Sequence, residues 1–173
     1  EFSDYQKVKE RIVLKLINTK ENEALLRGIP GVPFLDLTAV FYIWVDEDET
    51  GIMTALVHDE HMEMWGVDVD TLYEIAKENM RMGMPANVRS IGDMLGIKAG
   101  EDSMDGENER DIIILPSSVH ELLLLVDDGS YDYHELSLMV RGINESVVER
   151  EDRLSSCVYL YSWLHKQTVI IGC

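Results

Sequence analysis

The segment PSSVHE, residues 116–121, places candidate nucleophiles beside a candidate base. A serine hydroxyl becomes a nucleophile when a histidine accepts its proton and a carboxylate orients that histidine. The candidates are the hydroxyls of Ser117 and Ser118, the ring of His120 and the carboxylate of Glu121. On a strand, adjacent side chains point to opposite faces, so Ser118 and His120 share a face while Glu121 diverges.

The same segment lacks the G-x-S-x-G pattern that presents a catalytic serine at a strand-to-helix turn. The sequence therefore favours a turn between two apolar strands, in which the serine hydroxyls bond nearby backbone groups. A hydrolase that uses Ser117 or Ser118 with His120 remains the alternative.

Two histidines in HDEHMEMW form a second candidate site. His58 and His61 are three residues apart, so a helix would put both rings on one face, with Glu60 and Glu63 nearby. A zinc site needs three or four ligands, and the H-E-x-x-H order of zinc proteases is missing. We therefore expect one histidine to be exposed and the other to pack near Trp65, with the metal site as the weaker hypothesis.

The acidic segment 99–111 invites comparison with a calcium-binding loop. Glu101, Ser103 and Asp105 have the spacing of calcium ligands, but the twelfth position is Ile112, where a bidentate glutamate is required. The sequence favours a flexible, solvated acidic loop.

The charge balance excludes several classes of partner. The chain has 33 acidic and 15 basic residues and a formal net charge of −18. Proteins that bind nucleic-acid phosphates or anionic membranes need basic faces, and no lysine and arginine cluster could form one. An acidic surface that mimics nucleic acid and blocks a basic protein remains a weaker hypothesis.

Cofactor and membrane motifs are also missing from the sequence. It has no glycine-rich phosphate loop, no G-x-G-x-x-G and no C-x-x-C, so we predict no cofactor. No apolar run is long enough to span a bilayer, and no signal peptide is visible. Cys157 and Cys173 are too few for a disulfide scaffold and fit a reducing compartment, which predicts a cytoplasmic protein.

The hydrophobic pattern predicts mixed helices and strands. A first helix, capped by Ser3, is expected to run to about Asn18, followed by a short second helix over 21–27 and a loop at IPGVP. Residues 35–45 predict a strand buried on both faces, and 52–57 its hairpin partner. A longer helix should then begin at Asp70 or Thr71.

The second half alternates in the same way. DIIIL and ELLLLV predict two core strands, and Asp132 with Glu135 predicts the start of a helix. Residues 157–163 and 168–171 predict two more strands, or one strand and a tail. The expected fold is α+β, with a mixed or antiparallel sheet and helices packed mainly on one face, in a single domain over residues 1–173.

Three segments together carry a family resemblance: FLDLTAVFYIWV, HDEHMEMWGVDVDTLYEIAKENM and ILPSSVHELLLL, in that order. They resemble a family of uncharacterised bacterial proteins abundant in gut Clostridia, known only as a domain of unknown function. The resemblance covers residues 4–161 and implies no activity. Members of that family usually have a further strand and helix where this chain has its acidic segment 99–111.

No motif in the sequence completes a catalytic set. We therefore expect a non-enzymatic cytoplasmic module that acts through protein binding or regulation. The nine methionines, several of them close together, are compatible with an adaptable binding surface. The sequence makes no prediction of oligomeric state.

Overall fold

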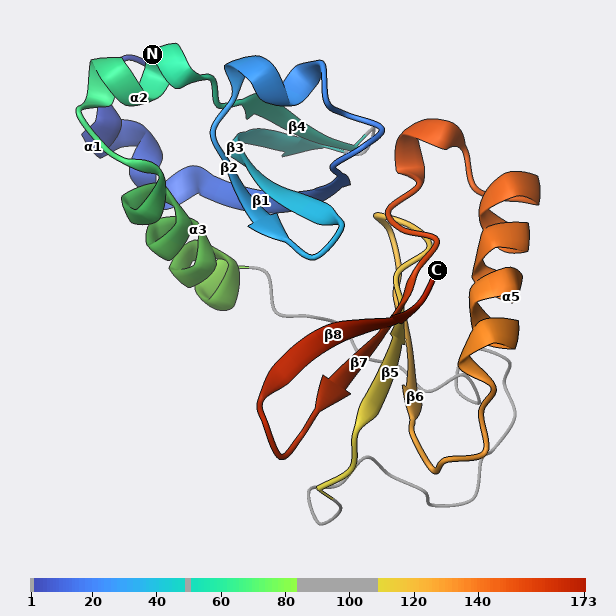
Figure 1. Ribbon diagram of the computed structural model, residues 1–173. Coiled ribbons are helices and arrows are strands. Elements are labelled where there is room, and N and C mark those ends of the chain that lie inside the picture. Colours follow the sequence, from blue (N-terminus) through green and yellow to red (C-terminus); the bar gives the residue numbers. More distant parts are fainter. Residues whose placement is uncertain (1, 49–50, 84–108) are drawn as a thin grey trace.

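The computed structural model describes residues 2–48, 51–83 and 109–173, which form two four-stranded sheets with helices beside each (Figure 1). Every strand pair in both sheets is antiparallel. The predicted α+β class is confirmed, although two antiparallel sheets take the place of the expected one.

The N-terminal sheet is organised around its long strand β3 (Leu37–Asp48). β1 (Ile12–Asn18) pairs along one side of β3, while β2 (Gly31–Phe34) and then β4 (Gly51–Leu56) pair along the other. Consecutive β3 residues point to opposite faces and are buried on both: Phe41 and Ile43 lie in one hydrophobic cluster, and Val40 lies in another. The prediction of a central strand buried on both faces is confirmed.

The predicted first helix is wrong beyond its first turn. α1 (Tyr5–Val8) is followed by the 3-10 turn Lys9–Arg11 and then directly by β1. The same apolar spacing fits a strand with two buried faces, because Ile12 and Ile17 enter different hydrophobic clusters. The β-branched residues at 12, 13 and 17 favour this outcome.

The short helix predicted at 21–27 and the loop predicted at IPGVP also differ from the structure. Only the 3-10 turn Leu25–Gly28 forms, and the second proline, Pro33, lies within β2. Proline is tolerated there because β2 is an edge strand that pairs with β3 alone. β3 begins after a tight turn in which Leu35 adopts a positive φ of 56°.

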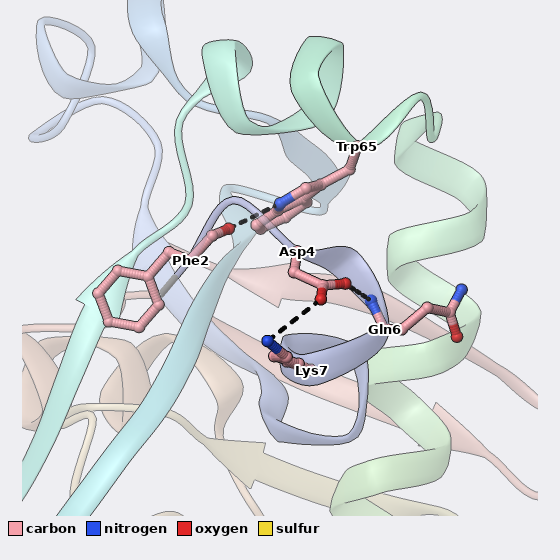
Figure 2. A network of polar contacts seen from close by, with 5 residues as sticks. All are labelled: Phe2, Asp4, Gln6, Lys7 and Trp65. Atoms are coloured by element: carbon pink, nitrogen blue, oxygen red, sulfur yellow. Dashed lines mark hydrogen bonds and ion pairs between the residues drawn. The ribbon is translucent and has the colours of Figure 1, made fainter.

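The end of α2 (Asp59–Trp65) contacts the segment that precedes α1. The indole Nε1 of Trp65 donates a 2.8 Å hydrogen bond to the Phe2 carbonyl oxygen (Figure 2). In the same view, Asp4 caps α1, since its carboxylate accepts the Gln6 backbone N–H. The predicted cap by Ser3 is therefore replaced by the next residue.

α3 (Val69–Gly83) packs against β1 and completes the N-terminal core. The helix is capped by Asp68, whose Oδ1 accepts the Thr71 backbone N–H at 2.8 Å, and not by Asp70 or Thr71 as predicted. Leu72 is fully buried in the core. The Asn79 amide further anchors the helix by donating to two backbone carbonyls, that of Lys9 in the 3-10 turn and that of Ile12 at the start of β1.

The C-terminal sheet has the strand order β6-β5-β7-β8. Its strands are β5 (Ile112–Leu115), β6 (Leu123–Val126), β7 (Val158–Ser162) and β8 (Gln167–Gly172). β5 and β6 were predicted from the sequence, and of the two alternatives left open for the last segments, the structure has two strands. α5 (Tyr133–Ser146) covers one face of this sheet and starts, as predicted, at Asp132, whose carboxylate accepts two backbone N–H groups (Figure 1).

The acidic segment 99–111 lies outside the described residues up to position 108, and so do its calcium-ligand candidates. None of the helices in the three described ranges combines the length and apolarity needed to cross a bilayer.

Candidate functional site

The PSSVHE segment continues the line of β5 and lies along residues 152–155. The Leu154 backbone N–H donates to the Ser117 carbonyl, and the Val119 N–H donates to the Asp152 carbonyl. Ser118 is 8% exposed, and its hydroxyl oxygen accepts the His120 backbone N–H at 3.0 Å. Ser118 thus has the role expected for a turn serine, in which the hydroxyl satisfies a nearby backbone group.

The ring of His120 faces a carboxylate. Its Nε2 lies 3.2 Å from Asp152 Oδ1, and its side chain is 71% exposed. Within the described residues, no hydrogen bond joins this ring to the hydroxyl of Ser117 or Ser118, and Glu121 is exposed. Asp152 is therefore a carboxylate that could orient His120, and the sequence did not predict it. The serine-hydrolase hypothesis also needs a serine hydroxyl hydrogen-bonded to the His120 ring, and the described contacts include none.

The two candidate metal ligands take part in the start of α2. The Nδ1 atom of His61 accepts the His58 backbone N–H at 3.0 Å, which caps the first turn of the helix. The His61 ring also lies 5.4 Å from the Trp65 ring, between centroids. Across the described ranges, no group of three or more His, Cys, Asp and Glu side chains could hold a metal ion.

A shallow cavity lies beside the same helix. It has a volume of about 360 Å³ and is lined by Asp59, Met62, Glu63, Gly66 and Val67. The lining has two carboxylates but no histidine, serine or cysteine, so the cavity does not fit the reactions that the sequence suggested.

The two cysteines form a disulfide, although the sequence-based interpretation was that they fit a reducing compartment. Cys157 and Cys173 are bonded across 16 residues of sequence, just before β7 and just after β8. They are brought together because β7 and β8 pair with Val158 opposite Gly172. Disulfides persist in oxidising compartments, so the cysteine argument for a reducing one no longer holds.

Sequence reasoning missed a polar cluster that joins the two sheets. Asp36, in the turn before β3, accepts hydrogen bonds from the Ser155 hydroxyl at 2.6 Å and the Tyr159 hydroxyl at 2.5 Å. Nearby, the Asn18 amide donates to the Leu154 carbonyl. Burial and the bond to Asp36 raise the pKa of Tyr159 well above its ordinary value. No local motif marks this cluster, because Asp36 lies more than 100 residues before Ser155 and Tyr159 in the sequence.

The C-terminal sheet also has an open apolar face, on the side opposite α5. Cross-strand pairing places eight side chains on it in two rows: Leu124, Ile114, Tyr159 and Ile170 in one, and Val126, Ile112, Tyr161 and Thr168 in the other. The N-terminal sheet covers the middle of the first row, where Tyr159 is 2% exposed. The ends stay open, with Leu124 and Val126 each 37% exposed and Ile170 39% exposed.

The model of DUF5688, a family of unknown function, matches residues 1–110 and 102–163. The chain belongs to DUF5688. The predicted resemblance to a domain of unknown function is thereby confirmed. No curated protein and no solved structure matches this DUF5688 chain significantly.

The two matched ranges of this DUF5688 chain overlap at residues 102–110, inside the acidic segment 99–111. The sites described above lie on either side of this overlap. The open apolar face belongs to the second range up to Tyr161 and extends beyond it into β8.

Proposed function

We propose that this DUF5688 protein is a non-enzymatic protein-binding module whose partner contacts the open face of the C-terminal sheet. The observation that carries the proposal is the exposure of Leu124 and Val126, which are neighbours on the open face at β6. Contiguous exposed apolar surface marks interaction sites more often than isolated exposed residues do.

The two faces of the sheet differ in a way that supports this function. Ile113 is buried under α5, whereas its neighbours Ile112 and Ile114 on the other face are half-buried. On that same face, Leu124 and Val126 of the adjacent strand are exposed. A strand whose side chains are apolar on both faces is typical of a sheet covered on both sides. A partner that covers the open rows would complete this arrangement.

The charge of the chain indicates the chemistry of the partner. With a net charge of −18, the protein attracts basic proteins over long range and repels acidic ones. We therefore expect a partner that combines apolar contact residues with surrounding lysine or arginine. A mimic of nucleic acid would share this preference for basic partners, but it would bind through carboxylates and not through the apolar rows.

The hydrolase hypothesis keeps one supporting contact, the pair of His120 with Asp152. The hypothesis also requires a serine hydroxyl that donates to the His120 ring. The hydroxyl oxygen of Ser118 instead accepts the His120 backbone N–H. The Cys157–Cys173 disulfide removes one of the reasons for expecting a cytoplasmic location.

A displayed library of random peptides tests the proposed function while the natural partner is still unidentified. Selection is made on the oxidised full-length protein, and each enriched peptide is then measured on Val126→Lys and on Val169→Lys. These two valines are matched, since both lie on edge strands and they are 37% and 40% exposed, but Val169 lies on the α5 side. We expect enriched peptides that lose binding only with Val126→Lys. Enrichment of no peptide, or equal binding by both variants, would contradict the proposal.

A further inference from the structure

The backbone of β6 carries hydrogen-bonding groups that no described residue satisfies. The Asp127 backbone N–H donates to the Asp111 carbonyl at 2.9 Å, which makes these two residues a hydrogen-bonded pair in the β5–β6 ladder. Such pairs alternate along antiparallel strands, so Leu123 and Leu125 also bond β5. The N–H and C=O groups of Leu124 and Val126 therefore point away from β5, toward the edge of the sheet.

This edge is open in the described part of the chain, where β6 pairs with β5 alone. Edge strands are usually protected against pairing by a charged side chain, a proline or a bulge. The sequence of β6, LLLV, has neither charge nor proline, and its pairing with β5 is regular. The residues whose backbone groups face outward, Leu124 and Val126, are also the ones that expose apolar side chains on the open face.

Carboxylates lie at both ends of this apolar edge. Glu121 precedes β6 and is exposed, and Asp127 and Asp128 follow it directly. Hydrogen bonds from Ser130, together with the charge of Arg110, lower the pKa of Asp128 below its ordinary value. An apolar strand edge between acidic ends is complementary to an extended apolar segment with basic ends.

Charge also argues against a second copy of this chain as the occupant. Two β6 strands related by a two-fold axis would pair antiparallel, which brings Glu121 of one copy near Asp128 of the other. Like charges placed together across an interface are destabilising. The segment Glu121–Asp128 contains no basic residue, and Arg110 from outside it acts on Asp128 alone of the two ends.

We propose that β6 binds an extended segment of a different protein as an added strand, and that the segment carries lysine or arginine on either side of an apolar, β-prone core. This inference rests on the proposed function and adds the site, the binding mode and the chemistry of the partner. Backbone hydrogen bonds to Leu124 and Val126 would supply affinity, and alternate side chains of the segment would contact the open face.

The probe is a fluorescein-labelled peptide with the sequence KKVTVTVKK, and its matched control is EEVTVTVEE. Both have the same strand-forming core and differ only in the charge of their ends. We expect the lysine-ended peptide to bind the oxidised full-length protein at least about tenfold more tightly at low salt, with a difference that shrinks as salt is added. Equal binding of the two peptides, or binding of neither, would overturn the inference.

Amide hydrogen exchange with and without the lysine-ended peptide tests the binding mode. The amides of Leu124 and Val126 should exchange about tenfold more slowly in the complex, because they gain hydrogen bonds. The Leu125 amide, which already bonds β5, should change much less. If the peptide binds and the two outward amides keep their free rates, the added strand is wrong.

Two variants localise the effect. Leu124→Pro removes one outward N–H without removing a bond to β5, and Val126→Lys places a charge on the edge, so both should abolish binding. Val169→Lys should bind as the wild type does. Because a proline can also disturb folding, the comparison of the two matched lysine variants decides, and equal binding by both would overturn the inference.

The added-strand binding mode and the proposed protein-binding function can fail separately. If library-selected peptides bind the open face while the amides of Leu124 and Val126 stay unprotected, the added strand falls and protein binding stands. If selection enriches no peptide, the proposed function itself falls.

Discussion

The Tyr159 hydroxyl donates a hydrogen bond to Asp36 Oδ1 and so links β7 of the C-terminal sheet to the turn before β3 of the N-terminal sheet. Ser155 reinforces the link by donating to the other carboxylate oxygen of Asp36. Apolar contacts surround this pair, since Leu37, Leu154 and Tyr159 share one hydrophobic cluster. The orientation of the two sheets therefore depends on a few residues. One of them, Tyr159, lies in β7, which also carries part of the open face.

Tyr159→Phe should destabilise the protein by about 2 kcal/mol, because it removes a hydrogen bond to a charged acceptor from a buried site. Tyr161→Phe is the matched control, since Tyr161 lies two residues further along β7 and is half-buried. The free energy of unfolding of the Tyr161→Phe variant should differ from that of the wild type by less than about 0.5 kcal/mol. Urea unfolding measures both, and equal losses would show that the Asp36 bond does not hold the sheets together.

Stability should fall above about pH 10, and Tyr159 should contribute to the fall. Its folded-state pKa is raised above the ordinary tyrosine value, first by burial and then by the bond to Asp36. The unfolded tyrosine loses its proton near its ordinary pKa while the folded one keeps it, so the contribution is complete below that pH and is lost as pH rises. Tyr159→Phe should show a shallower decline in urea unfolding between about pH 9 and pH 11. An unchanged slope would contradict this assignment.

Reduction of the disulfide should lower the free energy of unfolding by about 3 kcal/mol, the value expected for a loop of this length. Cys157 and Cys173 are 16 residues apart, and the bond closes the β7–β8 hairpin. Urea unfolding with and without a phosphine reductant measures the loss. The double variant Cys157→Ser/Cys173→Ser should be insensitive to the reductant. Two thiols that react in the folded, unreduced protein would show that the bond is absent.

Ester hydrolysis by the purified protein should not depend on Ser118. Its hydroxyl oxygen accepts a backbone N–H, and the ring of His120 pairs with Asp152. We expect the wild type, Ser117→Ala and Ser118→Ala to hydrolyse a p-nitrophenyl ester at equal rates. Loss of a catalytic nucleophile typically lowers the rate by a factor of about a thousand or more. A loss of that size in either variant would establish the hydrolase hypothesis.

Strands with simple local signals could be predicted from the sequence. DIIIL and ELLLLV are short apolar runs, and both became strands of the C-terminal sheet. Asp132 was predictable as a helix cap because its carboxylate acts on backbone N–H groups two and three residues away. These features depend on neighbours in the chain, which a sequence shows directly.

Features that depend on distant neighbours could not be predicted. The spacing of Ile12 and Ile17 fits a helix as well as a strand buried on both faces, and only packing against two different clusters decides between them. The disulfide needs the β7–β8 register, and the Asp36 cluster needs the contact between sheets. The partner of His120, Asp152, is 32 residues away and was missed for the same reason.

The central claim is that a partner binds the open face of the C-terminal sheet through β6. Its most direct test is the dissociation constant of one library-selected peptide, measured on the wild type, Val126→Lys and Val169→Lys. The account predicts a loss of at least about tenfold for Val126→Lys, since a charge would be buried in an apolar contact, and a value within about twofold of wild type for Val169→Lys. Equal affinities for all three proteins would contradict it.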